Sequence, residues 1–105
     1  MAPPPLDLVF GALSDPTRRA ILAMLQAEGE APVRDLAARF EISRPGVSKH
    51  LAVLRHAGLV VETKRGRENH YALERERLGE ARHWLTQFWK GRLAALKTIA
   101  ENMDD

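Results

Sequence analysis

The stretch VRDLAARFEISRPGVSKHLAVLRHAG, residues 33–58, holds two apolar-periodic segments with a break between them. The first segment repeats apolar residues at helical spacing, which predicts a short helix over residues 34–40. A three-residue turn follows, and its last residue, Ser43, can cap a second helix that ends at Gly58. Two helices joined by about three residues are typical of a helix-turn-helix. We therefore place a helix-turn-helix at about residues 33–57.

The flanking sequence completes a recognisable order of elements. Before this stretch, the pattern predicts a helix over residues 6–13, a second helix from the N-cap residue Asp15 to about Glu28, and an extended link at 31–33. After it, β-branched residues around Gly66 predict a hairpin with strands at 59–65 and 68–73, followed by a helix from about 75 to 102. A hairpin directly after a helix-turn-helix is a wing. The predicted fold is therefore mainly α (α+β), a winged helix-turn-helix with a two-stranded wing, in one domain over residues 1–105.

Charge is unevenly distributed along the chain. The net charge is only +2, but residues 43–67 contain six cations and a single acid, Glu62. A local basic block in a nearly neutral chain is the electrostatic pattern of a nucleic-acid footprint. A basic helix face taken alone is more often just solvated surface, so the prediction rests on the block coinciding with the helix-turn-helix and the wing.

The second helix of the motif sorts into two faces at 100° per residue. Val47, Leu51 and Leu54 form an apolar stripe that should pack on the preceding helix. The opposite face is small, hydroxylic or cationic, which suits a helix entering a major groove about 12 Å wide. The cations at the hairpin tip should reach flanking phosphate or minor groove. The predicted DNA-binding residues are Ser43, Arg44, Pro45, Ser48, Lys49, Lys64, Arg65 and Arg67.

The last helix carries an apolar stripe too wide for a chain of 11.8 kDa to bury alone. Both tryptophans lie within six residues of each other here. Intramolecular core is one explanation for any single aromatic residue, but the width of the stripe predicts that part of it meets a second copy of the chain. The predicted dimer-interface residues are Leu6, Val9, Phe10, Trp84, Leu85, Phe88, Trp89 and Leu96.

Several classes of protein find no support in the sequence. The chain contains no cysteine, which removes disulfides, thiolate metal sites and cysteine nucleophiles. The four histidines form no short-spaced ligand set, and neither a phosphate-binding glycine loop nor a nucleophile elbow occurs. No signal peptide and no apolar run of membrane-spanning length is seen. We expect a cytoplasmic protein without cofactor, metal, membrane contact or enzymatic activity.

Three motifs in order resemble the ArsR-type winged-helix repressors. The segment Phe10–Leu22, FGALSDPTRRAIL, is similar to the opening of that family, and Ile42–Leu51, ISRPGVSKHL, to its recognition helix. Leu54–Val60 with Gly66-Arg67 and Tyr71–Leu73 resembles the family's wing. The resemblance implies a homodimer that binds operator DNA and a repression relieved by a signal, which in many members is a metal ion.

The chain departs from the family where metal-sensing members hold their ligands. The family's thiolate site on the third helix would fall near residues 31–36, which hold no cysteine. Another common site uses histidines and carboxylates on the terminal helix, where this chain has only His83. We therefore expect a homodimeric, metal-indifferent repressor of a pseudo-palindromic operator. The alternative is a winged helix whose groove-facing surface binds another protein, and the inducing signal stays open.

Overall fold

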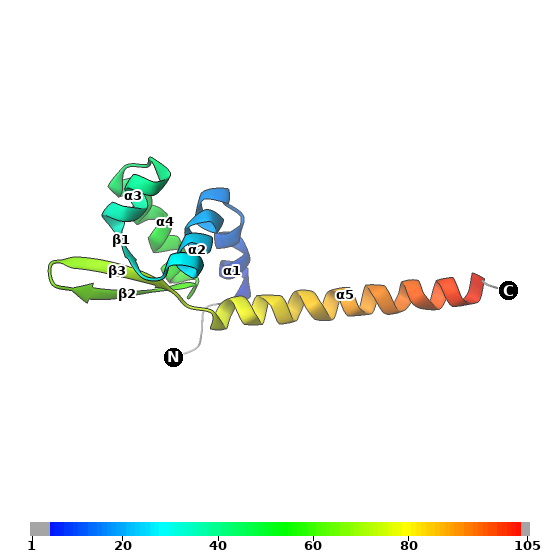
Figure 1. Cartoon of the computed structure of the whole chain (residues 1–105). Helices are drawn as coiled ribbons and strands as arrows, with labels where there is room; N and C mark the ends of the chain where they lie inside the picture. Colours follow the sequence, from blue (N-terminus) through cyan, green and yellow to red (C-terminus); the bar gives the residue numbers. More distant parts are fainter. Residues whose placement is uncertain (1–4, 104–105) are drawn as a thin grey trace.

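The computed structural model describes residues 5–103. Its elements follow one another as α1 (Leu6–Leu13), α2 (Pro16–Glu28), β1 (Ala31–Pro32), α3 (Val33–Phe40), α4 (Arg44–His56), β2 (Val60–Arg65), β3 (Glu68–Leu73) and α5 (Glu76–Met103). The first four helices form a small bundle, the hairpin of β2 and β3 extends from one side, and α5 runs out from the other (Figure 1). The predicted winged helix-turn-helix fold is confirmed.

Local chemistry explains where the middle helices begin and end. The Asp15 carboxylate accepts from the Arg18 backbone N–H at 3.0 Å and caps α2, and Ser43 Oγ accepts from the Gly46 N–H at 3.1 Å and caps α4. Gly29 and Gly58 follow α2 and α4 with φ of 85° and 77°, values that cost glycine little. The capping residues and the stops are thus those that the sequence predicts.

The sheet differs from the prediction by one strand. It is antiparallel with the order β1-β3-β2, so the segment expected to be an extended link pairs with the wing through Ala31 and Tyr71. A strand of two residues is too short to show an alternation of apolar and polar side chains, which is why no pattern reveals it. At the wing tip, the β2–β3 register leaves Gly66 and Arg67 as a two-residue loop, and the φ of 63° at Gly66 suits a hairpin turn.

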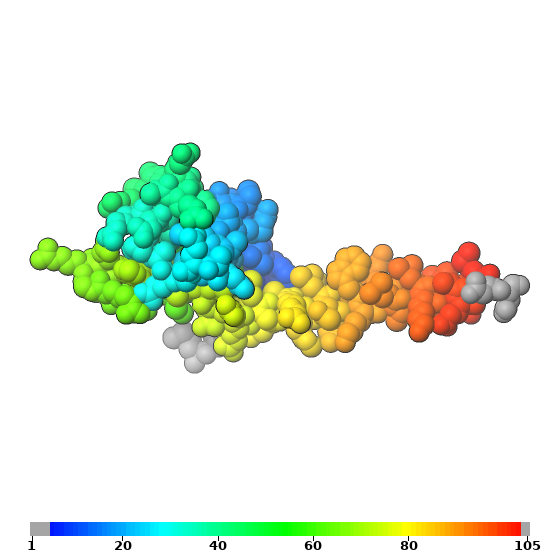
Figure 2. Space-filling model, in the orientation of Figure 1, coloured from blue at the N-terminus to red at the C-terminus, as the bar shows by residue number. Residues whose placement is uncertain are grey.

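One core holds the bundle, the wing base and the start of α5 together. Its largest fully buried side chains are Val9, Ile21, Leu36, Val47, Leu51, Leu54 and Leu59. From α5 only Arg77 and Ala81 are buried, and every residue from 82 to 103 is exposed. The molecule measures 69 × 34 × 20 Å because α5 extends beyond the bundle (Figure 2).

Candidate nucleic-acid interface

The turn between α3 and α4 sets the angle at which the reading helix is presented. Glu41 adopts the left-handed conformation with φ 54°, and Ile42 N–H donates to the Ala37 carbonyl at 3.1 Å. This conformation is uncommon for residues other than glycine, and a glutamate in the sequence does not indicate it. The sequence therefore predicts a turn here but not its geometry.

The two faces of α4 divide as the helical spacing predicts. Val47, Leu51 and Leu54 have no exposed surface and pack in the core. The opposite face is open to solvent and contains five of the predicted DNA-binding residues, Ser43, Arg44, Pro45, Ser48 and Lys49. The residues of α4 include no acid, so its exposed face has nothing that repels phosphate.

Gly46 allows the first turn of α4 to form beside the preceding turn. A Cβ atom at this position would lie 2.8 Å from Ile42 Cγ2 and 3.1 Å from Ser43 Oγ. The Ser43 cap and the half-buried Ile42 side chain therefore occupy the space that any larger residue needs. The geometry of the N-terminal turn, which places Arg44 and Ser48, depends on this glycine.

The wing cations fall into two groups. Lys64 and Arg67 form no ion pair within residues 5–103 and are exposed at the hairpin tip. Arg65, in contrast, forms a two-pronged contact with the Glu30 carboxylate, one arm at 3.0 Å, and His70 Nδ1 lies 3.3 Å from the same carboxylate. The Arg65 hydrogen bond lowers the pKa of Glu30, and the Glu30 carboxylate raises the pKa of Arg65. Arg65 is therefore engaged within the protein, which its sequence position does not reveal.

A small polar cavity of about 190 Å³ lies where the starts of α3 and α4 meet β3. Arg34 and Arg44 both line it, together with Asn69. Arg34 is ion-paired with Glu68 of the wing and lies 3.5 Å from Asp35. The sequence analysis does not single out Arg34, which precedes the basic block. Like Arg65, it is engaged within the protein by an acid.

The histidines are dispersed in the structure. His50 Nδ1 lies 3.9 Å from the Asp15 carboxylate, so the reading helix touches the N-terminus of α2. The pKa of the Asp15 carboxyl is lowered, chiefly because it accepts a hydrogen bond from the Arg18 backbone N–H. Within residues 5–103, no three His, Cys, Asp or Glu side chains gather closely enough to hold a metal ion.

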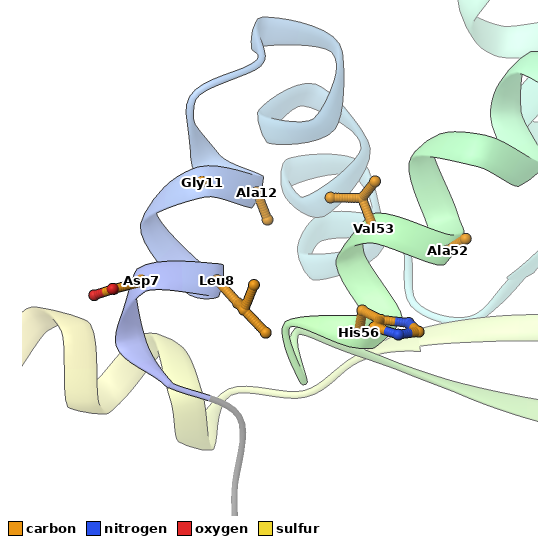
Figure 3. A pocket seen from close by; sticks show the side chains of 7 residues that line it. All are labelled: Asp7, Leu8, Gly11, Ala12, Ala52, Val53 and His56. Atoms are coloured by element: carbon orange, nitrogen blue, oxygen red, sulfur yellow. The ribbon is translucent and has the colours of Figure 1, made fainter.

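An apolar groove of about 410 Å³ separates the second half of α4 from α1 (Figure 3). Leu8 of α1 and Val53 of α4 lie on opposite walls, and His56 stands at the end of the α4 wall (Figure 3). The side chain of Asp7 points away from α4, toward the other side of α1 (Figure 3). The groove walls are thus mainly apolar, and Asp7, which also borders the groove, points its carboxylate away from α4.

That other surface joins α1 to the exposed part of α5. Phe10 meets Trp84 edge to face at 5.7 Å, Trp84 stacks on Phe88 at 6.0 Å, and Phe88 meets Trp89 at 5.8 Å. The exposed fractions of Trp84, Phe88 and Trp89 are 52%, 50% and 56%. Of the eight predicted interface residues, Leu6 and Phe10 are half-buried and the five from α5 are exposed. Val9 corrects the prediction, because its side chain is fully buried in its own core and has no surface to offer a partner.

None of the helices within the described residues is long and apolar enough to cross a membrane.

Comparisons with known proteins agree with this geometry. A family model described as a helix-turn-helix domain matches residues 13–63. The transcriptional repressor SdpR of Bacillus subtilis is 38% identical over 79% of this chain and 91% of its own length. The arsenical resistance operon repressor of Escherichia coli is 33% identical over 94% of this chain and 84% of its own. The solved structure of an ArsR-like transcriptional regulator from Rhodococcus sp. RHA1 is 40% identical and superimposes with a TM-score of 0.74, covering 90% of this chain and 92% of the other.

These relatives are named as regulators and repressors rather than enzymes, and the solved structure shares the overall fold of this chain. Their similarity extends well beyond the motif matched by the family model, over most of each protein. The chain therefore belongs to the ArsR family of winged helix-turn-helix, DNA-binding transcriptional regulators.

Proposed function

We propose that the chain acts as a homodimeric repressor that reads a pseudo-palindromic operator with α4. The observation that carries the proposal is the acid-free outer face of α4, exposed beside the free wing cations Lys64 and Arg67. A helix of this kind can enter a major groove and use hydroxyl and amine groups on base edges. A two-fold dimer would present two such helices to successive major grooves, about 34 Å apart.

The residues divide into two roles under this proposal. Ser48 and Lys49, in the second turn of α4, read bases and nearby phosphates. Arg67, at the wing tip, binds flanking phosphate. Losing a base contact typically costs about 1–3 kcal/mol at one position, whereas losing a phosphate contact weakens binding to all sequences alike.

The test begins by selecting bound fragments from genomic DNA with the purified protein. Each variant is then titrated on a selected duplex and on a scrambled duplex across a salt series. Ser48→Ala and Lys49→Ala should lower specific binding more than non-specific binding. Arg67→Ala should lower both and should reduce the salt slope by about 0.9 per contact, or nearly two per dimer. If all three variants bind like wild type, the basic block is only a solvated face.

We also propose that DNA binding is indifferent to metal ions. The support is a cysteine-free sequence with one histidine, His83, on α5. Affinity for the selected duplex should change by less than about twofold with chelator or with micromolar zinc, since residues 5–103 gather no ligand set that would couple metal to DNA binding. A tenfold loss on adding zinc, reversed by chelator and abolished in His83→Ala, would contradict this.

A further inference from the structure

The outer part of α5 carries a cation that has no partner among the residues that the structure describes. Arg92 is exposed and forms no ion pair or side-chain hydrogen bond within residues 5–103. The positions three and four residues away along the helix are Phe88, Trp89, Ala95 and Leu96, so no neighbouring acid can pair with it. Arg92 thus stands inside an apolar stripe that the bundle does not reach.

Asp7 is the complementary charge on the other side of the same surface. A groove of about 480 Å³ runs between α1 and α5, lined by Leu6, Asp7, Phe10, Trp84 and Leu85. Four of these residues are apolar, and Asp7 is the single charged group among them. Asp7 is exposed, forms no ion pair within the described residues, and points away from α4 (Figure 3).

The two charges do not pair with each other within the described protomer. Trp84 lines the groove beside Asp7, and Arg92 lies eight residues, or about 12 Å, further along the same straight helix. The helix leads away from the bundle between these positions (Figure 1). Any acid that neutralises Arg92 inside an interface must therefore come from another molecule.

A two-fold pairing of α5 helices brings the charges together. Aromatic anchors gather near the centre of protein interfaces, which places the two-fold axis near Phe88, the middle of the Trp84–Phe88–Trp89 cluster. In an antiparallel pair that crosses at Phe88, position 92 lies opposite position 84 of the other helix. Arg92 then faces the groove in which Asp7 is the one charged residue. Glu76 and Glu80 line an adjoining groove that also contains Trp84, and Glu80 is already paired with Arg77 of its own helix.

We propose that Arg92 of one protomer pairs with Asp7 of the partner subunit and that this pair, formed twice per dimer, sets the register of self-association. The proposal rests on the homodimer proposed above. It adds that the groove between α1 and α5 receives Arg92 of the second copy, which pairs there with Asp7. Burial of the apolar stripe stabilises the dimer. The paired charges select the one alignment of the two α5 helices that leaves neither Arg92 nor Asp7 unpaired.

Charge exchange tests the pair directly. Wild type is first shown to dimerise by sedimentation equilibrium. Asp7→Arg and Arg92→Asp should each weaken the homodimer by about tenfold or more, because each variant sets like charges against each other twice. An equimolar mixture of the two variants should form a heterodimer of near wild-type affinity, and the double variant Asp7→Arg/Arg92→Asp should recover the homodimer.

Two controls make the same charge changes elsewhere. Lys97→Asp alters the same helix about 140° around from Arg92, and Asp35→Arg alters α3. Neither should change dimer affinity by more than about twofold, and circular dichroism confirms that every variant is folded. Single variants that dimerise like wild type, or that are not rescued by mixing or in the double variant, would overturn the pair. A monomeric wild type would instead overturn the homodimer on which the pair depends.

Discussion

At the scale of single residues, Arg65 shows how a cation of a basic block can be occupied by its own protein. Its guanidinium contacts the Glu30 carboxylate with two nitrogens, and His70 Nδ1 lies 3.3 Å from the same carboxylate. A DNA phosphate would have to compete with Glu30 for the same donors. The cation count of residues 43–67 therefore overstates the charge available to DNA. Arg55 is also less available to DNA than the count suggests, since it is paired with Glu62.

Replacing Glu30 with glutamine should free Arg65 for phosphate. Glu30→Gln should tighten binding to selected and scrambled duplexes alike and should steepen the salt slope by about 0.9 for each arginine that gains a phosphate. The measurement is the titration of both duplexes across a salt series. Glu28→Gln is the matched control, because it releases Arg39 from a comparable surface pair between α2 and α3. An unchanged salt slope in Glu30→Gln would show that Arg65 is a structural residue of the wing.

Gly46 is the residue on which the start of the reading helix depends. Gly46→Ala places a methyl group 2.8 Å from Ile42 Cγ2, so the turn or the cap must shift. We expect a loss of about 1–3 kcal/mol in the free energy of unfolding, as in other overpacked sites. Gly79→Ala is the control, since that helical position has no atom within 4 Å and alanine should stabilise it by up to about 1 kcal/mol. Urea unfolding of both variants measures the contrast, and equal stability of the two would contradict the steric argument.

At the scale of elements, α2 and α4 begin with caps that respond differently to pH. Asp15 caps α2 as a carboxylate, and the hydrogen bond with the Arg18 backbone holds its pKa below the usual value. A lowered pKa in the folded state adds stability above the unfolded pKa, and this stability is lost as the pH falls through the folded value. Ser43 caps α4 with a hydroxyl that does not titrate in this range.

The stability lost on removing each cap should therefore depend differently on pH. Asp15→Ala should be less stable than wild type at neutral pH, and the difference should shrink as the pH is lowered from about 5 toward 2. Ser43→Ala should lose about 0.5–2 kcal/mol over the same range without such a trend. Thermal or urea unfolding at each pH provides the comparison. A constant difference for Asp15→Ala would mean that its charge does not contribute to the cap.

The elements also show how far sequence patterns reach. Helix boundaries follow from short-range chemistry, a cap such as Ser43 or a stop such as Gly58, and these were predictable. The β1 strand was not, because it depends on pairing with β3, which is distant in the sequence. The left-handed Glu41 and the buried Arg77 were not either, because neither residue type is typical of such a conformation or of such burial. Nothing local distinguishes Arg77 from its exposed neighbour Arg75.

The candidate site divides in the same way. The outward face of α4 is set by helical periodicity and was predictable from the sequence. The pairing of Arg65 with Glu30 joins residues 35 positions apart, and the contact of Arg34 with Glu68 joins α3 to the wing. Such contacts depend on how the wing packs against α3. Residue spacing alone therefore identifies the surface but not which of its cations are free.

At the scale of the whole molecule, the exposed apolar stripe of α5 is the surface on which the proposed dimer depends. Its exposed stripe contains Leu85, Phe88, Leu96 and Ile99, with exposed fractions between 41% and 59%. A contiguous apolar surface of this kind on a small protein marks an interaction site. If that site joins two copies, DNA is bound by two reading helices and two wings whose spacing is fixed by α5.

Disrupting the stripe should therefore change DNA binding without touching the reading helix. Leu85→Glu introduces a charge into the apolar lining of the groove that also contains Asp7, so a dimer would bury two like charges side by side. Because Leu85 is 41% exposed in the single chain, the variant can fold as a monomer. Sedimentation should give one chain mass in place of two, and circular dichroism should show an unchanged helix content.

The DNA titration of this variant connects assembly to function. A monomer reaches one half-site and neutralises half as many phosphates, so its salt slope should fall to about half that of wild type. It should also bind a duplex carrying one half-site as tightly as a duplex carrying two, because it has no second reading helix to engage the other. Lys97→Glu changes charge on another face of α5 and should keep both the dimer and the full slope. A monomeric Leu85→Glu protein that retained the wild-type slope would show that each chain binds DNA independently and that α5 serves another partner.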